Sequence, residues 1–133
     1  MSNHYEYKTS LPDKDAIYVF YQEMGWNDYL KLSADALFEA MQHSSYSLYV
    51  YQDNKLVATV RLVSDGVISA YLCGLGVLKE HRNKGIARQL VEMVADFCKE
   101  RGLHLQFFCE PELTAFYEKL GFLTFATGMK MKD

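Results

Sequence analysis

The sequence predicts an α/β fold: a mixed, mostly antiparallel sheet of about six or seven strands, flanked by about four helices. Residues 47–78 hold successive apolar, β-branched segments separated by short turns, a pattern typical of an antiparallel meander. A strand, an amphipathic helix over 86–101 and another strand then follow in order, which implies a parallel crossover. The chain has 133 residues, and half of them are hydrophobic, so we expect one domain (1–133) with one core.

The N-terminal third predicts one short strand and two helices. Residues 5–8 alternate weakly and form the expected strand. Asp13 is the expected N-cap of the first helix, which Gly25 ends, and Ser33 is the expected N-cap of the second. The aromatic stretch 26–29 between these helices is predicted to be a loop.

Strands are then predicted over 47–51, 56–63 and 67–78. Gly74 and Gly76 lie inside the last of these strands, where glycine often marks a bulge or a close approach of another group to the backbone.

The C-terminal half begins with the helix over 86–101, which Gly102 is expected to end. Residues 103–109 predict a strand and residues 113–120 a short helix. Residues 122–125 and 129–132 are predicted to pair as a closing hairpin.

Composition excludes several classes of protein. The net charge of −3 disfavours a dedicated nucleic-acid binder, and no apolar run approaches the length of a membrane span. The three cysteines show no Cys-x-x-Cys spacing and no signal peptide precedes the chain, so a reducing cytoplasm is expected. The scattered histidines predict no metal site.

A short basic turn joins the strand 67–78 to the helix 86–101. The first N–H groups of a helix lack intrahelical partners, so such a turn can bind phosphate. Lys79 and three further basic residues of this turn add positive charge. Neither a Walker loop nor a dinucleotide-binding fingerprint is present. The alternative is an ordinary turn glycine, Gly85, beside solvated charges.

Two motifs resemble the GCN5-related N-acetyltransferases. Residues 82–87, Arg-Asn-Lys-Gly-Ile-Ala, fit that family's acyl-CoA motif, Arg/Gln-x-x-Gly-x-Gly/Ala, with Ala87 in the last small position. Residues 115–122, Ala-Phe-Tyr-Glu-Lys-Leu-Gly-Phe, are similar to its C-terminal signature. The resemblance covers nearly the whole chain.

The resemblance implies a splayed pair of parallel strands, 67–78 and 103–109, with acetyl-CoA wedged between them. Backbone N–H groups of the turn would hold the pyrophosphate, and the preceding strand would pair with the pantetheine arm. The implied cofactor-binding residues are Leu75, Gly76, Val77, Arg82, Asn83, Lys84, Gly85, Ile86, Ala87 and Arg88.

The resemblance also implies that Tyr117 is the general acid that protonates the departing thiolate, whereas the alternative is a core aromatic residue. The N–H group of Val77 would polarise the thioester carbonyl. One departure concerns Glu112, which stands where the family often has an asparagine that contacts pantetheine.

The general base is not identified from the sequence. The strand 67–78 has no acidic residue, and the nearby acids are expected to be solvated surface groups: Glu23, Asp28, Asp65 and Glu110. Cys73 and Cys109 could accept the acyl group as thiolates, but cysteines in apolar strands are usually small buried hydrophobes.

The predicted function is transfer of an acetyl group from acetyl-CoA to a primary amine by direct attack. By the resemblance, the loop 26–29 and the helix around 37–41 flank the acceptor site. The acceptor is a small molecule or a peptide, with no nucleic-acid, membrane or metal partner. The alternatives are a catalytically silent CoA-binding module and a nucleic-acid partner of the basic turn. Exposed strand edges are consistent with a homodimer.

Overall fold

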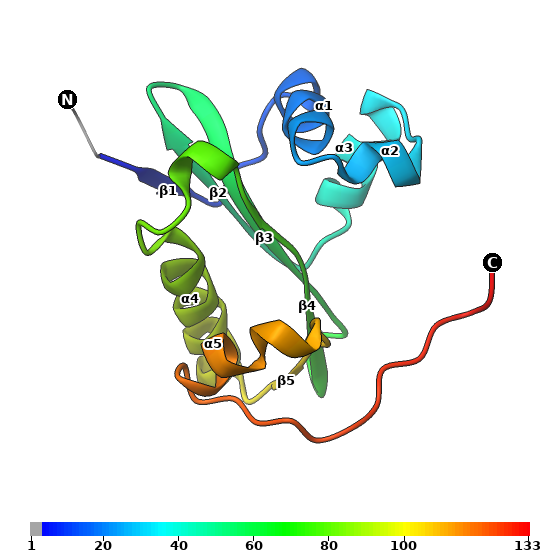
Figure 1. Ribbon diagram of the computed structural model, residues 1–133, viewed down its shortest axis with the longest axis vertical. Coiled ribbons are helices and arrows are strands. Elements are labelled where there is room, and N and C mark those ends of the chain that lie inside the picture. The colour runs from blue at the N-terminus through cyan, green and yellow to red at the C-terminus, as the bar shows by residue number, and fades with distance from the viewer. Residues whose placement is uncertain (1–3) are drawn as a thin grey trace.

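The structure is a computed structural model that describes residues 4–133; residues 1–3 of the predicted domain lie outside this range. Its described residues form one five-stranded sheet, in the order β1-β2-β3-β4-β5 (Figure 1). β1 to β4 pair antiparallel, and β5 is parallel to β4. The strands are β1 (Glu6–Lys8), β2 (Tyr46–Gln52), β3 (Lys55–Ser64), β4 (Ser69–Val77) and β5 (His104–Gln106). The mixed, mostly antiparallel α/β fold is therefore confirmed.

Helices cover both faces of this sheet. Figure 1 shows α1 to α3 on one side and α4 on the other. The helices are α1 (Lys14–Glu23), α2 (Trp26–Leu30), α3 (Ala34–Gln42), α4 (Ile86–Arg101) and α5 (Thr114–Glu118), with 3₁₀ turns η1 (Lys79–His81) and η2 (Pro111–Leu113). No helix within residues 4–133 is both long and apolar enough to cross a membrane.

The alternation of side chains along β2 and β3 separates the two faces of the sheet. Tyr46 stacks on Phe97 of α4 with ring centroids 3.9 Å apart, so its face of β2 packs against α4. The fully buried residues in register on that face are Leu48, Val50, Ala58, Val60 and Leu62. Ser47, Tyr49, Thr59 and Arg61 therefore face the α1–α3 side.

Local signals placed several helix ends correctly. The Ser33 hydroxyl accepts a hydrogen bond from the Ala36 N–H at 3.1 Å, as expected for an N-cap. Gly25 and Gly102 adopt left-handed conformations with φ of 77° and 67° at the predicted stops. Asp13 precedes α1, but its side chain makes no capping bond.

Three expectations need correction. The described chain has five strands rather than six or seven, since residues 122–133 form no hairpin, and β5 stops at Gln106. β5 pairs with β4 over only three residues, so it offers a short edge to any further strand. A hairpin that cannot join a sheet is only marginally stable. Residues 26–30 form the short helix α2 instead of a loop, which raises the helix count to five.

A β-bulge lies where the glycines of β4 predicted an irregularity. Arg61 pairs with Cys73 and Thr59 with Gly76, so two residues of β4 oppose Val60 of β3. Gly74 has φ of 63°, and a Cβ there would lie 3.2 Å from Arg61 Nε. A Cβ at Gly76 would lie 2.4 Å from the indole of Trp26, so the close approach to this glycine comes from α2.

Candidate active site

The basic turn 79–88 presents an array of backbone N–H groups. Asn83 and Gly85 are left-handed, with φ of 62° and 82°, which turns the chain sharply into α4. The first helical bond is Gln89 N–H to the Gly85 carbonyl at 3.0 Å. Within residues 4–133, the N–H groups of residues 83–88 donate to no protein acceptor. No side chain caps this helix, and the space beside Gly85 is open.

The basic side chains of the turn have different roles. Arg82 Nε donates to the Val77 carbonyl at 3.0 Å, which fastens the turn to the end of β4. Arg88 lies 3.5 Å from Glu92 one helical turn later. Lys79 and Lys84 are exposed and have no acidic partner in the described part of the chain. These two lysines are therefore free to face a bound anion.

The two parallel strands separate well before β4 reaches this turn. β4 and β5 pair only between Ser69–Tyr71 and His104–Gln106. Beyond Tyr71, β4 continues to Val77 without a partner on that edge. Leu78 donates to the Val57 carbonyl on the β3 side, so alternation turns the Val77 N–H toward the open edge. The end of β4 thus has an N–H group available to an extended ligand.

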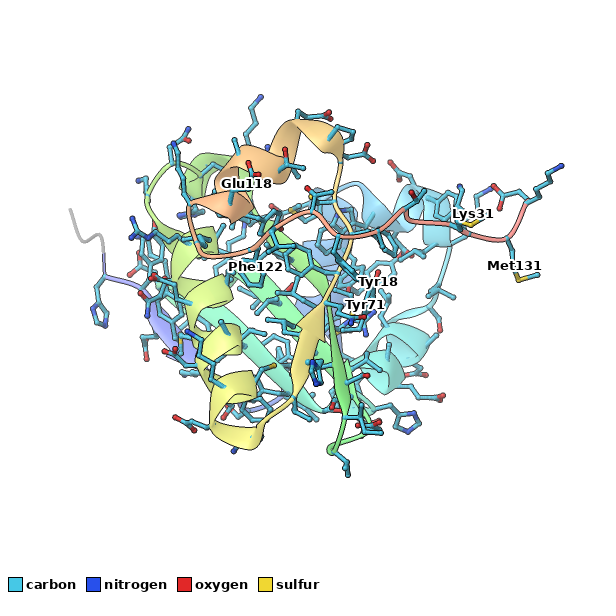
Figure 2. The ribbon with its side chains drawn as sticks, turned by 90° about the horizontal axis from the view of Figure 1, so that it is seen from below. Tyr18, Lys31, Tyr71, Glu118, Phe122 and Met131 are labelled. Atoms are coloured by element: carbon cyan, nitrogen blue, oxygen red, sulfur yellow. The ribbon has the colours of Figure 1, made fainter. Side chains whose placement is uncertain are left out.

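Tyr117 lines a cleft of about 510 Å³ beside β5. The walls of this cleft come from residues 105–109, α5 and the C-terminal segment, which in Figure 2 runs past Phe122 toward Met131. No residue of β4 or of the basic turn lines it. The structure therefore brings residues 75–88 together but does not place Tyr117 in the same cavity.

The surroundings of Tyr117 favour packing. Its ring lies 4.6 Å from that of Phe107 and 5.0 Å from that of Phe116, and only 8% of the residue is exposed. Burial, followed by the nearby Cys109, raises the pKa of the Tyr117 phenol above its ordinary value. The hydroxyl makes no hydrogen bond within the described residues, so it could donate to a ligand.

A second pocket, of about 450 Å³, opens on the α1–α3 side of the β4 bulge. Its walls come from α1, the start of α2, β3 and β4: Tyr21, Gly25, Trp26, Tyr29, Leu30, Arg61, Gly74 and Leu75. The Trp26 ring packs edge-on against Tyr21, with centroids 5.1 Å apart. This pocket includes two of the aromatics expected near the acceptor site, whereas no residue of α3 lines it.

Asn27 holds α2 in place, a role that the sequence did not reveal. Its side-chain amide donates to Gln22 Oε1 at 2.8 Å and to the Leu32 carbonyl at 2.9 Å. Its side-chain oxygen accepts from the Leu32 N–H at 2.9 Å. Asn27 is buried, and it fixes the segment that carries Trp26 and Tyr29. The signal was a polar residue in a short stretch between two aromatics, Trp26 and Tyr29, a pattern that also occurs in ordinary loops.

We expect Asn27→Ala to destabilise the domain by about 1–3 kcal/mol, since buried backbone and side-chain groups lose partners. Urea unfolding of the variant measures this loss. Tyr29→Ala on the same helix is the control, because its side chain is exposed and its removal should change stability little. Equal stabilities of the wild type and Asn27→Ala would contradict the anchoring role.

The acidic candidates for a base are occupied elsewhere or exposed. The Asp65 carboxylate accepts N–H groups of Val67 at 2.8 Å and Ile68 at 2.7 Å, and these bonds lower its pKa. Glu23 pairs with Lys55 at 3.1 Å. Asp28 and Glu110 are exposed. Asp65 is therefore the cap of the β3–β4 turn.

Two of the cysteines, Cys73 and Cys98, do not have the surroundings of a nucleophile, whereas Cys109 is half-buried and lines the Tyr117 cleft. Burial raises the pKa of the Cys73 thiol, and the charge of Arg61 only partly opposes this rise. Cys98 is buried, and its pKa is also raised. Among residues 4–133, no group of three potential ligands could hold a metal ion.

Comparison with known proteins is consistent with these features. A model of the acetyltransferase (GNAT) family matches residues 10–122. The chain is 27% identical over 94 residues to "GCN5-related N-acetyltransferase 1, chloroplastic" of Arabidopsis thaliana. The aligned region covers 68% of this chain and 48% of that protein. The chain thus spans about half the length of this relative.

Solved structures agree in fold. A GNAT-family protein from Xanthomonas campestris pv. campestris is 26% identical, with a TM-score of 0.75 over 91% of this chain and 85% of that one. The glucosamine-6-phosphate N-acetyltransferase of Arabidopsis thaliana is 18% identical, with a TM-score of 0.78 over 98% and 99%. The family match spans most of the chain, from before α1 to the end of the C-terminal signature, and the chain belongs to the GNAT family of acetyltransferases.

Proposed function

We propose that the chain transfers an acetyl group from acetyl-CoA to a primary amine. The observation that carries this proposal is a pair of open backbone stretches, the free edge at the end of β4 and the N–H groups of residues 83–88. There, backbone N–H groups without protein acceptors suit a pyrophosphate, and the free end of β4 suits a pantetheine arm. The proposed cofactor-binding residues are those expected from the sequence, residues 75–77 and 82–88. These residues suit coenzyme A as the donor.

The proposed reaction is a direct attack of the amine on the thioester. The amine nitrogen attacks the thioester carbonyl carbon, and the Val77 N–H donates to the oxygen as negative charge develops on it. The new C–N bond forms, the C–S bond then breaks, and the thiolate receives a proton from the Tyr117 hydroxyl, which regains a proton from water. The proton lost by the amine goes to water, since the acids near the site are paired or exposed.

The pocket between α2 and the β4 bulge would hold the acceptor. It opens on the opposite side of the sheet from α4, beside Gly74 and Leu75. The solved relatives do not indicate which amine binds. One is named for glucosamine-6-phosphate and another, from Brucella melitensis biovar Abortus 2308, for a ribosomal-protein alanine. The acceptor must be inferred from this chain's own pocket.

A catalytically silent CoA-binding module is the second candidate. Two observations favour it: Tyr117 packs among aromatic rings outside the open edge, and β4 carries no acid. The deciding experiment measures thiol release from acetyl-CoA with a panel of primary amines, together with calorimetric binding of CoA. Amine-dependent thiol release supports the transferase. CoA binding without release supports the module, and the absence of both contradicts the whole assignment.

Salt should weaken CoA binding, because Lys79 and Lys84 are exposed and their attraction to phosphate is screened. We expect calorimetric affinity to fall as NaCl is raised from low to physiological concentration. Dephospho-CoA, which lacks one phosphate, should lose part of this dependence. An unchanged affinity would mean that the backbone N–H groups alone carry the binding.

A further inference from the structure

Arg61 is a partly buried cation in the wall of the α2 pocket. It projects from β3 toward the α1–α3 side, and its side chain crosses the β4 bulge above Gly74. Its Nε is fully buried and has no hydrogen-bond partner. The glycine makes room for this arrangement, since a Cβ at position 74 would lie 3.2 Å from that nitrogen. The guanidinium thus lies at the bulge, where the acceptor would meet the thioester.

The charge of Arg61 is not neutralised by the described protein. No carboxylate among residues 4–133 lies within ion-pair distance of it. Its hydrogen-bond partners are neutral: Nη1 donates to the Ser44 hydroxyl at a long 3.4 Å, and the Tyr21 hydroxyl is a second partner. By contrast, Lys14 and Lys55, which are exposed, each have an acidic partner within 3.1 Å. A poorly paired buried cation is costly, and a bound anion would remove that cost.

The neighbouring polar groups are neutral. The buried Ser47 and Tyr49 hydroxyls face the same side of the sheet as Arg61 and interact with each other. Burial raises the pKa of Tyr21, another residue of the pocket wall, and the nearby charge of Arg61 partly opposes this rise. The polar lining is therefore cationic or neutral, and it contains no acid.

We propose that Arg61 selects an acceptor that carries an anionic group, a carboxylate or a phosphate, in addition to its primary amine. The guanidinium would hold the anion, and the rings of Trp26 and Tyr29 would cover the carbon chain between the two ends. A polyamine would place a second cation beside Arg61 and is disfavoured. This inference rests on the proposed acetyl transfer.

The test compares amines that differ only in the anion. 5-Aminopentanoate is paired with pentylamine, and aminoethyl phosphate with ethanolamine, so the two pairs distinguish carboxylate from phosphate. We expect kcat/KM to be higher for at least one anionic member, and Arg61→Gln to lower that value about 10- to 100-fold, the loss expected for a hydrogen bond to a charged group. The rates with pentylamine and ethanolamine should fall much less, because these amines carry no anion for Arg61 to hold.

Two further variants separate recognition from support of the fold. Arg61→Lys keeps the charge and should retain part of the preference. Lys55→Gln removes an exposed cation from the same strand and should change neither pair. Equal rates within both pairs in the wild type would overturn the proposal. An equal loss of kcat/KM for anionic and neutral amines in Arg61→Gln would also overturn it, because that result would mean that Arg61 only supports the bulge.

A binding readout separates this inference from the proposed function. Trp26 is the single tryptophan of the chain and lines the pocket, so its fluorescence reports occupancy. If no amine supports thiol release, the transferase proposal fails, and titration with 5-aminopentanoate and aminoethyl phosphate still decides the anion site. A fluorescence change that Arg61→Gln abolishes supports the site. No change, or the same change in both proteins, contradicts it.

Discussion

Gly85→Asp should abolish CoA binding while the domain stays folded. Gly85 is left-handed, with φ of 82°, and no atom lies within 4 Å of the position that a Cβ would take. The new side chain therefore meets no protein atom, and the backbone costs about 1–2 kcal/mol. Its carboxylate would occupy the space beside the free N–H groups and repel the pyrophosphate. Calorimetry with CoA measures the loss, and a thermal melt checks the fold.

Gly85→Asn is the matched control for this charge. Asparagine has nearly the same shape as aspartate and tolerates the left-handed conformation, but it is neutral. The asparagine variant should bind CoA more tightly than the aspartate variant. Folded Gly85→Asp protein with wild-type affinity would place the phosphate site elsewhere.

Tyr117→Phe should lower turnover by roughly ten- to ten-thousand-fold if the phenol protonates the thiolate. The substitution removes one oxygen and keeps the ring that packs on Phe107 and Phe116, so affinity for acetyl-CoA should change little. Burial raises the pKa of this phenol above about 10, so it stays protonated through the neutral range. The wild-type rate should therefore decline only at strongly alkaline pH, and the variant should lack that decline.

Stability distinguishes the core reading of Tyr117. A neutral phenol with a raised pKa contributes stability below the unfolded pKa, and this contribution disappears as pH rises through the higher folded value. If Tyr117 is only a core residue, Tyr117→Phe should change turnover no further than it changes the amount of folded protein. Steady-state kinetics and melts on one preparation separate the two cases. A stable variant with near-normal turnover would remove Tyr117 from the reaction.

Local chemistry explains what the sequence could predict. The turn into α4 depends on Gly85 and on the residues next to it, and the Ser33 cap depends on an N–H group three residues away. The strands of the meander follow from alternation over short spans. These signals do not depend on distant partners, so the positions of the turn before α4, of the Ser33 cap and of the antiparallel strands were predicted correctly.

Contacts between distant segments explain what it could not predict. Gly76 indicated a close approach, but its partner is Trp26, 50 residues earlier in the chain. Arg61 lies within the predicted strand 56–63, and no local signal sets it apart. The bulge at Gly74 places its side chain in a pocket. The predicted C-terminal hairpin was wrong because its strands needed an edge that the short β5 does not supply.

In the proposed binding mode, the cofactor would lie along the open edge of β4 as a further strand of the sheet. A pantetheine arm beside Val77 would continue the ladder where β5 departs, so binding and completion of the sheet are one event. A ligand at a hundred times its dissociation constant adds about 2.7 kcal/mol to the free energy of unfolding. The lifetime of this protein in a cell should therefore follow the supply of acyl-CoA. Amide hydrogens along the end of β4 should exchange slowly when that supply is ample and rapidly when it is exhausted.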